Sequence, residues 1–206
     1  MDAPGHYFSE TPAGPLCRWS VTVDVDPDLG SYELDGVSGV FAARRLDEAT
    51  RSLLRLAPRP PITGHVLDLG CGYGPIACTL ARRSPAATVW ATDVNQRARE
   101  ATAVNAQRLG LANIRVITPD EVPPDVRLAA VYSNPPIRIG KPALHELLLH
   151  WLALLSPDGV AYLVLLKSLG SDSMQRWLNE VGYACVRLAS EKGARILMVT
   201  PRDASR

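Results

Sequence analysis

The sequence contains no long apolar run and no recognisable leader. Its longest apolar stretches, residues 147–155 and 160–166, are shorter than the roughly 20 residues that cross a bilayer, and His150 interrupts the first. The first ten residues show neither the basic region nor the apolar region of a signal peptide. We therefore expect no membrane span and a cytoplasmic location.

Cysteine pairs and excess charge are also missing. The four cysteines form no CxxC pair and have no nearby histidine, so neither a metal site nor a disulfide framework is expected. The formal net charge of +1 excludes a strongly basic nucleic-acid clamp but permits a local patch. Residues 1–40 hold one arginine against seven acidic residues, and residues 41–60 hold five arginines against two. An acidic lead-in is thus followed by a basic segment.

The first 60 residues differ in pattern from the rest of the 206-residue chain. Residues 16–25 and 31–34 alternate as the strands of a hairpin do, around a turn at 26–30. Apolar spacing then predicts a helix over 41–56, which the following prolines end. The length suits about one domain, so we expect residues 1–60 to be an extension packed on a core of residues 61–206.

Strands and helices alternate along the core. The predicted strands and helices are 65–69, 75–83 (helix), 88–92, 96–109 (helix), 114–117, 128–132, 141–155 (helix), 160–166, 171–181 (helix), 183–188 and 196–200. Such alternation is typical of βαβ units and a parallel sheet, here closed by an antiparallel pair. The sequence predicts an α/β fold with a doubly wound, Rossmann-like, seven-stranded sheet and a small N-terminal hairpin and helix.

A glycine-rich turn follows the first core strand. That strand ends in Asp68, and glycines at 70, 72 and 74 lead into a helix. Glycines let the backbone approach a ligand closely, and the helix start offers free N–H groups. A dinucleotide fingerprint would need its third glycine at position 75, where Pro75 stands. The turn therefore predicts a small-molecule cradle that does not bind NAD.

Asp93 follows the second core strand, where an acidic residue of doubly wound folds takes both hydroxyls of a ribose. Together with the glycine turn, it resembles the class I S-adenosylmethionine (SAM)-dependent methyltransferases. The resemblance implies SAM as cofactor, with Asp68 near its methionine amino group, Asp93 on its ribose and Asp120 at its adenine. The cofactor contacts that it implies in these turns are Asp68, Gly70, Cys71, Gly72, Gly74, Asp93, Val94 and Asp120.

Asn134-Pro135-Pro136-Ile137 follows the fourth core strand. The Asn134 carboxamide oxygen and the next backbone carbonyl, stiffened by two prolines, make two acceptors that suit an exocyclic or amide NH₂ group. They would orient the nitrogen lone pair toward an incoming methyl group, so we expect the rate of methyl transfer to depend mainly on how the two groups are positioned. An isolated Asn-Pro-Pro would be only a turn. We expect these four residues to form the catalytic site.

The string from Asn134 to Lys141, with His145, resembles the 16S ribosomal RNA guanine-N2 methyltransferases, specifically their single-domain members. Further matches are His6-Tyr7-Phe8, Gly39-Val40-Phe41, Asp47, Thr50, and the segment from Leu166 to Ser173. The resemblance implies that Phe41 and Thr50 lie over the cofactor, with Asn134 at the cofactor as well; Phe41 could instead be core. Ile137 stands where the family has an aromatic residue, which weakens stacking on a flipped base. Ala194 also stands where family members often have an aromatic residue, so substrate contacts near the last hairpin are expected to differ.

The predicted function is methyl transfer from SAM to an amino group of a base in ribosomal RNA, first of all guanine N2 of 16S RNA in the small subunit. Another base, adenine included, modified for antibiotic self-resistance remains open, as do a protein glutamine amide and a module that binds SAM without turnover. We expect no metal, ribosomal RNA within the 30S subunit as partner, and a possible homodimer. Candidate phosphate contacts are the segment 41–60 and Arg138, Lys141, Lys167 and Arg195.

Overall fold

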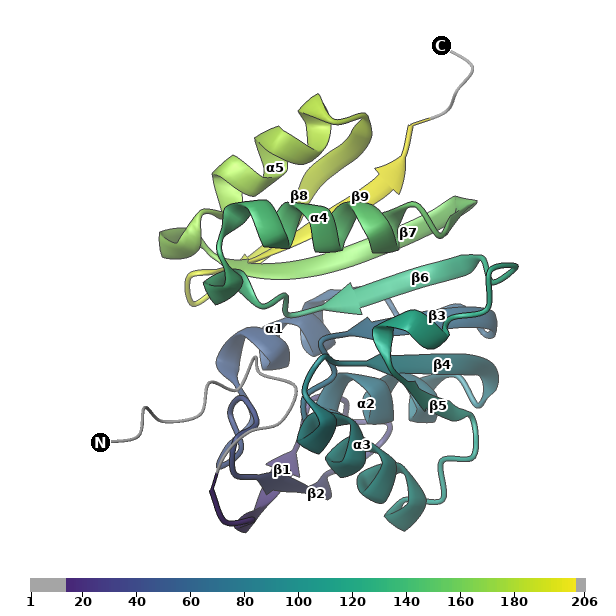
Figure 1. Cartoon of the computed structure of the whole chain (residues 1–206), viewed down its shortest axis with the longest axis vertical. Coiled ribbons are helices and arrows are strands. Elements are labelled where there is room, and N and C mark those ends of the chain that lie inside the picture. Colours follow the sequence, from purple (N-terminus) through teal and green to yellow (C-terminus); the bar gives the residue numbers. More distant parts are fainter. Residues whose placement is uncertain (1–13, 203–206) are drawn as a thin grey trace.

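The computed structural model describes residues 14–202 and consists of a central sheet between two layers of helices (Figure 1). The strand order is β5-β4-β3-β6-β7-β9-β8, and β9 runs opposite to the other six strands of this sheet. The predicted seven-stranded, doubly wound α/β fold is thereby confirmed. Its strands are β3 (Thr63–Leu69), β4 (Ala86–Thr92), β5 (Ile114–Ile117), β6 (Leu128–Ser133), β7 (Leu155–Leu166), β8 (Tyr183–Glu191) and β9 (Ala194–Pro201).

Helices cover both faces of this sheet because its inner strands are apolar on both sides. Neighbouring residues of β3 show this: Val66 packs with one buried cluster and Leu67 with the other. Buried residues of three helices belong to the first cluster, and those of two helices to the second. The first face carries α1 (Glu48–Leu56), α2 (Pro75–Arg83) and α3 (Gln96–Arg108), and the second carries α4 (Lys141–Leu152) and α5 (Ser171–Glu180).

The N-terminal segment forms the hairpin β1 (Arg18–Val23) and β2 (Tyr32–Val37), which packs on the first helical face. The hydroxyl of Tyr32 lies 2.6 Å from Thr79 Oγ1 of α2. The acidic turn between the strands meets arginines of the following segments, since Asp26 pairs with Arg83 at 2.7 Å and with Arg59 at 3.1 Å. The opposite charges of the lead-in and the basic segment therefore partly neutralise each other within the chain.

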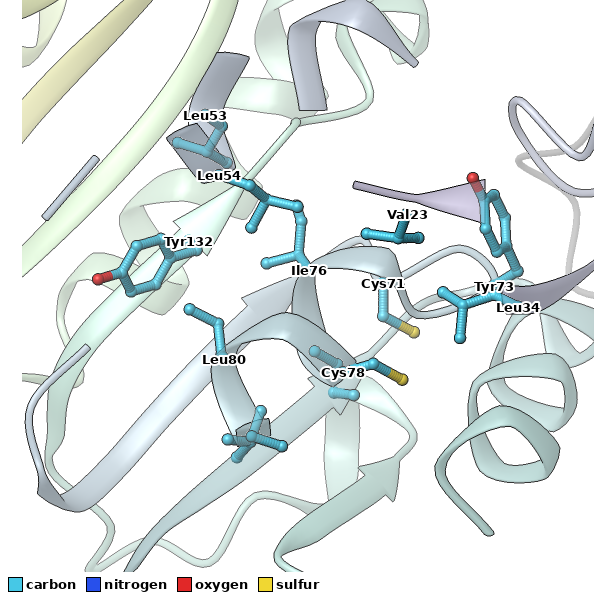
Figure 2. Packing of buried hydrophobic residues seen from close by; sticks show 14 of the residues in the cluster. Val23, Leu34, Leu53, Leu54, Cys71, Tyr73, Ile76, Cys78, Leu80 and Tyr132 are labelled. Atoms are coloured by element: carbon cyan, nitrogen blue, oxygen red, sulfur yellow. The ribbon is translucent and has the colours of Figure 1, made fainter. Parts of the chain in front are cut away.

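Two buried leucines anchor helix α1 on the first face of the sheet. Figure 2 shows Leu53 and Leu54 of α1 directed toward Ile76 of α2, with Tyr132 of β6 nearby. Leu53 and Leu54 are fully buried, and deleting such side chains typically costs about 2 to 5 kcal/mol. The position of α1 relative to the sheet is thus set by core packing.

Two predicted helix boundaries are wrong. The helix expected over 41–56 begins only at Glu48, because Ala42 has a left-handed φ of 52° and Asp47 caps the helix N-terminus. The helix expected over 141–155 ends at Leu152, and the turn expected at 156–159 is an irregularity inside β7, where the register with β6 shifts.

His6-Tyr7-Phe8, which match the family that the sequence resembles, lie outside the described part of the chain. Within residues 14–202, no helix combines the length and the apolar character that crossing a bilayer demands.

Candidate active site

A cavity of about 330 Å³ opens at the carboxyl ends of the parallel strands. The loops after β3, β4, β6 and β7 line it. From the N-terminal segment, residues 40–42 and Asp47, Ala49 and Thr50 also line it. Ligands of open α/β sheets bind in this position, and the volume is in the range of small-molecule sites.

The glycine turn after β3 forms the floor of this cavity. Gly70, Gly72 and Gly74 all have left-handed φ angles of 79°, 59° and 93°. A methyl group at position 74 would lie 3.1 Å from the side chain of Thr102, so α3 packs directly against the turn. Gly74 is the residue that precedes α2 and does not line the cavity, so its predicted cofactor contact is not supported. Gly70 and Gly72 line the cavity, and there the backbone can approach a ligand without a side chain in between, as a cofactor cradle requires.

Cys71 lies within the same turn and lines the cavity, but it is buried. Burial, with Asp93 and Asp68 nearby, raises the pKa of the Cys71 thiol well above its ordinary value. A neutral thiol is a poor nucleophile, so this residue contributes an apolar wall rather than reactivity.

Asp93 connects the glycine turn to α3. Its Oδ2 accepts a hydrogen bond from the backbone N–H of Gly72 at 3.0 Å, and its Oδ1 accepts one from that of Asn95 at 2.9 Å. Burial raises the pKa of this carboxyl above its ordinary value, against those two bonds. Each carboxylate oxygen retains further acceptor capacity, so both can still receive hydroxyl groups of a ligand. The arrangement fits a ribose diol, as predicted for SAM.

Asp68 occupies a different place from the one predicted. It is fully buried beneath the glycine turn and does not belong to the cavity wall. Its Oδ2 accepts a hydrogen bond from the N–H of Ala77 in the first turn of α2 at 2.9 Å, whereas its Oδ1 has no partner among the described residues. Burial raises the pKa of Asp68 to about 8. Its side chain therefore supports the turn from below and is not placed for a direct ligand contact.

The adenine end of the predicted site also differs in one residue. Val94 lines the cavity and is 47% exposed, which suits a flat apolar ligand surface. Across from the β4 loop, Pro119 lines the cavity, while the predicted Asp120 is exposed and lies off the wall. Because only the 3₁₀-turn geometry of Pro119–Glu121 decides which residue faces inward, the sequence could not distinguish the two.

Asn134, Pro135, Pro136 and Ile137 all line the cavity next to the glycine turn. The N–H of Ile137 donates to the carbonyl oxygen of Pro135 at 2.8 Å, and Pro136 has φ −76° and ψ 70°, the geometry of an inverse γ-turn. The turn fixes the direction of the Pro135 carbonyl, which keeps its second lone pair. The predicted Asn-Pro-Pro-Ile site is thus assembled at the cavity.

Asn134 is held by two residues of the N-terminal segment. Its Nδ2 donates to Asp47 Oδ2 and to Thr50 Oγ1, both at 3.0 Å. Phe41, 45% exposed, lies on the same side of the cavity, so the alternative that Phe41 is a core residue is not supported. The family resemblance implies that Thr50 lies at the cofactor but gives no role to Asp47. An aspartate at a helix N-cap is the feature of the sequence that could have pointed to Asp47.

The predicted phosphate contacts divide into two groups. Arg138 lies on the cavity rim, and Lys141 and Lys167 are exposed at the starts of α4 and of the turn after β7. Arg195 is only 11% exposed and pairs with Asp172, so its prediction as a substrate contact is not supported. Several arginines of the segment 41–60 are also paired within the chain: Arg51 with Glu48, Arg55 with Glu191, and Arg59 with Asp26 and Asp28.

Comparisons with known proteins find matches that cover most of the chain. A family model described as "Methyltransferase small domain" matches residues 31–198. A Bacillus subtilis protein, "Uncharacterized protein YbxB", is 30% identical over 195 residues, which cover 93% of this chain and 96% of that one. Ribosomal RNA small subunit methyltransferase C of Pseudomonas putida (strain W619) is 36% identical over 145 residues, which cover 59% of this chain but 41% of the relative. This chain therefore matches less than half of the latter protein.

Among solved structures, the T. thermophilus 16S rRNA N2 G1207 methyltransferase RsmC, in complex with AdoMet and guanosine, superposes with a TM-score of 0.76. It is 23% identical, and the match covers 93% of this chain and 52% of the other, so it shows the common fold. The glycine turn, the Asp93 carboxylate at the cavity wall and the size of the cavity all fit SAM. The chain belongs to the methyltransferase small domain family and is a SAM-dependent methyltransferase.

Proposed function

We propose that the protein methylates an exocyclic amino group of a base in ribosomal RNA, and that this group is guanine N2 of 16S RNA in the small subunit. The observation that carries the proposal is the orientation of Asn134. With Nδ2 bonded to Asp47 and Thr50, only Oδ1 of the carboxamide is left for a ligand in the cavity. An oxygen acceptor selects a substrate that donates, as an NH₂ group does.

The chemistry follows from two acceptors and one electrophile. When bound, SAM supplies a methyl group on a positively charged sulfonium. Asn134 Oδ1 and the Pro135 carbonyl oxygen would each accept a hydrogen bond from one N–H of the target NH₂, which directs the nitrogen lone pair at the methyl carbon. As the N–C bond forms, the C–S bond breaks with its electron pair on sulfur, and the methylated nitrogen releases one proton to water. No strong base is required before the transfer, and none lies among the four catalytic-site residues.

RNA as substrate is supported by the relatives that carry the name ribosomal RNA small subunit methyltransferase C and by basic residues at the rim. Ile137 offers the base an apolar contact instead of an aromatic face. Stacking on a flipped base is therefore weaker here, and more of the base selection rests on the hydrogen bonds of the Asn-Pro-Pro turn.

The test is methylation of defined substrates with labelled SAM. We expect label in N2-methylguanosine of 16S RNA when the protein is incubated with 30S particles, and none in 50S particles. Deproteinised RNA shows whether the assembled subunit is needed. Label in adenine, or in glutamine of a ribosomal protein, would reject guanine N2 in favour of those substrates.

A variant of the catalytic turn tests the assignment of Asn134. Asn134→Ala should lower kcat by about a hundredfold or more, since misplaced reacting atoms cost this much, while the dissociation constant for SAM stays close to that of the wild type. Calorimetry measures the SAM affinity separately from turnover. Undiminished methyl transfer by this variant would remove Asn134 from the mechanism.

A further inference from the structure

We propose that Asp47 and Thr50 are positioning residues, which hold the Asn134 carboxamide with its oxygen toward the target amine. The inference rests on the proposed function, because it concerns how Asn134 is oriented for an NH₂ substrate. It adds a part of the N-terminal segment, outside the sheet and its connecting loops, to the catalytic machinery. Neither residue needs to touch the substrate for this role.

The hydrogen bonds define the orientation of the amide without ambiguity. A carboxylate only accepts hydrogen bonds, so the group of Asn134 that lies 3.0 Å from Asp47 Oδ2 must be the NH₂ group. The second proton of that group is directed to Thr50 Oγ1 at the same distance. Both donors are therefore used, and within residues 14–202 nothing donates to Oδ1 of Asn134. A flipped amide would place two oxygens against each other at Asp47 and leave a donor facing the substrate amine.

Both positioning residues are themselves rigid. Asp47 is the N-cap of α1, and the same Oδ2 that accepts from Asn134 also accepts from the backbone N–H of Thr50 at 3.0 Å. Thr50, one turn into the helix, is only 5% exposed. The helix is fixed in turn by Leu53 and Leu54, which are fully buried in the cluster that also contains Ile76 of α2 (Figure 2). The packed helix therefore holds the Asn134 amide through two acceptor atoms, Asp47 Oδ2 and Thr50 Oγ1.

The charge of Asp47 has a second effect on the amide. Among the described residues, Asp47 forms no ion pair within 4.0 Å. A hydrogen bond from Nδ2 to an anion draws the amide proton toward the carboxylate and makes Oδ1 a stronger acceptor. During transfer, the target nitrogen gains positive charge while the sulfonium loses it. A preoriented acceptor backed by an anion stabilises that charge more than a neutral acceptor does.

Two substitutions separate the charge from the hydrogen bond. Asp47→Asn retains a good helix cap and one acceptor oxygen but removes the anion. Thr50→Val keeps the shape of the side chain and removes the acceptor, and Thr50→Ser restores it. Ser52→Ala is the matched control, because Ser52 is buried in the same helix and bonds Glu191, away from Asn134.

For Asp47→Asn and Thr50→Val we expect kcat to fall about ten- to hundredfold, the scale of a slightly misplaced reacting group, with the SAM dissociation constant unchanged. Thr50→Ser and Ser52→Ala should have kcat values close to that of the wild type. Wild-type kcat in both Asp47→Asn and Thr50→Val, or an equal loss in Ser52→Ala, would overturn the proposal, since helix loosening alone would then account for the effect.

A measurement without RNA distinguishes failure of this inference from failure of the proposed function. In NMR spectra of the wild-type protein, the side-chain NH₂ protons of Asn134, assigned by their absence in Asn134→Ala, should exchange slowly with solvent. This protection should be lost in Thr50→Val and in Asp47→Ala, and kept in Ser52→Ala. Fast exchange in the wild type, or protection that these substitutions leave unchanged, would show that the amide is not held, whichever substrate is methylated.

Discussion

Replacing Asp68 by asparagine should remove a fall in stability with rising pH. Asp68 is fully buried, and among residues 14–202 only its Oδ2 receives a hydrogen bond, from the N–H of Ala77. Burial raises the pKa of Asp68 from its ordinary value of 3.8 to about 8, and the Ala77 bond only partly opposes it. Between these two values the folded protein retains a proton that the unfolded chain has released.

The magnitude follows from proton linkage. Between about pH 4 and 8 the folded state binds one proton more than the unfolded state at this site, so the free energy of unfolding falls by about 1.4 kcal/mol per pH unit. Across the whole window the loss amounts to about 6 kcal/mol; below it the loss is absent, and above it the loss is constant. Asparagine cannot ionise, so the free energy of unfolding of the variant, relative to that of the wild type, rises by the same amount per pH unit. The extra buried amide donor adds a cost of about 1 to 3 kcal/mol, which is independent of pH.

Urea unfolding at about pH 5.5, 6.5 and 7.5 measures the difference between variant and wild type. Other titrating groups act on both proteins, so they cancel in the difference. Asp158→Asn, at an exposed position, serves as a control whose curve should run parallel to that of the wild type. If the Asp68→Asn curve also runs parallel, Asp68 is ionised in the folded protein and the argument from burial is refuted.

Two further predictions concern the ligands. Asp93→Ala should weaken SAM binding by about 1 to 3 kcal/mol, because a charge-assisted diol contact and the bond to Gly72 are lost together; calorimetry measures it, and an unchanged affinity would contradict the ribose assignment. Affinity for ribosomal RNA should fall with salt at a slope of only about two to four phosphate contacts, because the formal net charge is only +1 and Arg51, Arg55 and Arg59 pair with carboxylates of the chain itself. Charge reversal by Arg138→Glu with Lys141→Glu should weaken that binding and spare SAM; methylation of 30S particles with unaltered salt dependence would place the RNA elsewhere.

Features that depend on a short stretch of sequence were predictable. The apolar strand before Asp68, the spaced glycines and the acid at position 93 each follow from local patterning, because strand ends of a parallel sheet meet at one edge. The Asn-Pro-Pro turn was placed correctly for the same reason, since it ends the strand that pairs with β3.

Features that depend on residues far apart in the chain could not be predicted from the sequence. The bond between Asp47 and Asn134 joins residues 87 positions apart, and no periodicity relates them. Arg195 was expected to face phosphate, but its carboxylate partner lies on α5, which packs against its strand. The start of α1 also escaped prediction, since residues 41–46 have helical spacing while the cap at Asp47 determines where the helix begins.

Hydrogen bonds within the protein hold the backbone of the cofactor cradle. Asp93 already binds the backbone of Gly72 and Asn95, and the N–H groups of Gly70 and Cys71 both donate to the carbonyl of Thr92 at 2.9 Å. Binding to such a preorganised loop involves little loss of chain entropy, so little of the contact energy is cancelled by ordering. The heat-capacity change of SAM binding should accordingly reflect buried apolar surface alone, without a folding contribution. An enzyme built in this way can bind its methyl donor without help from the methyl acceptor.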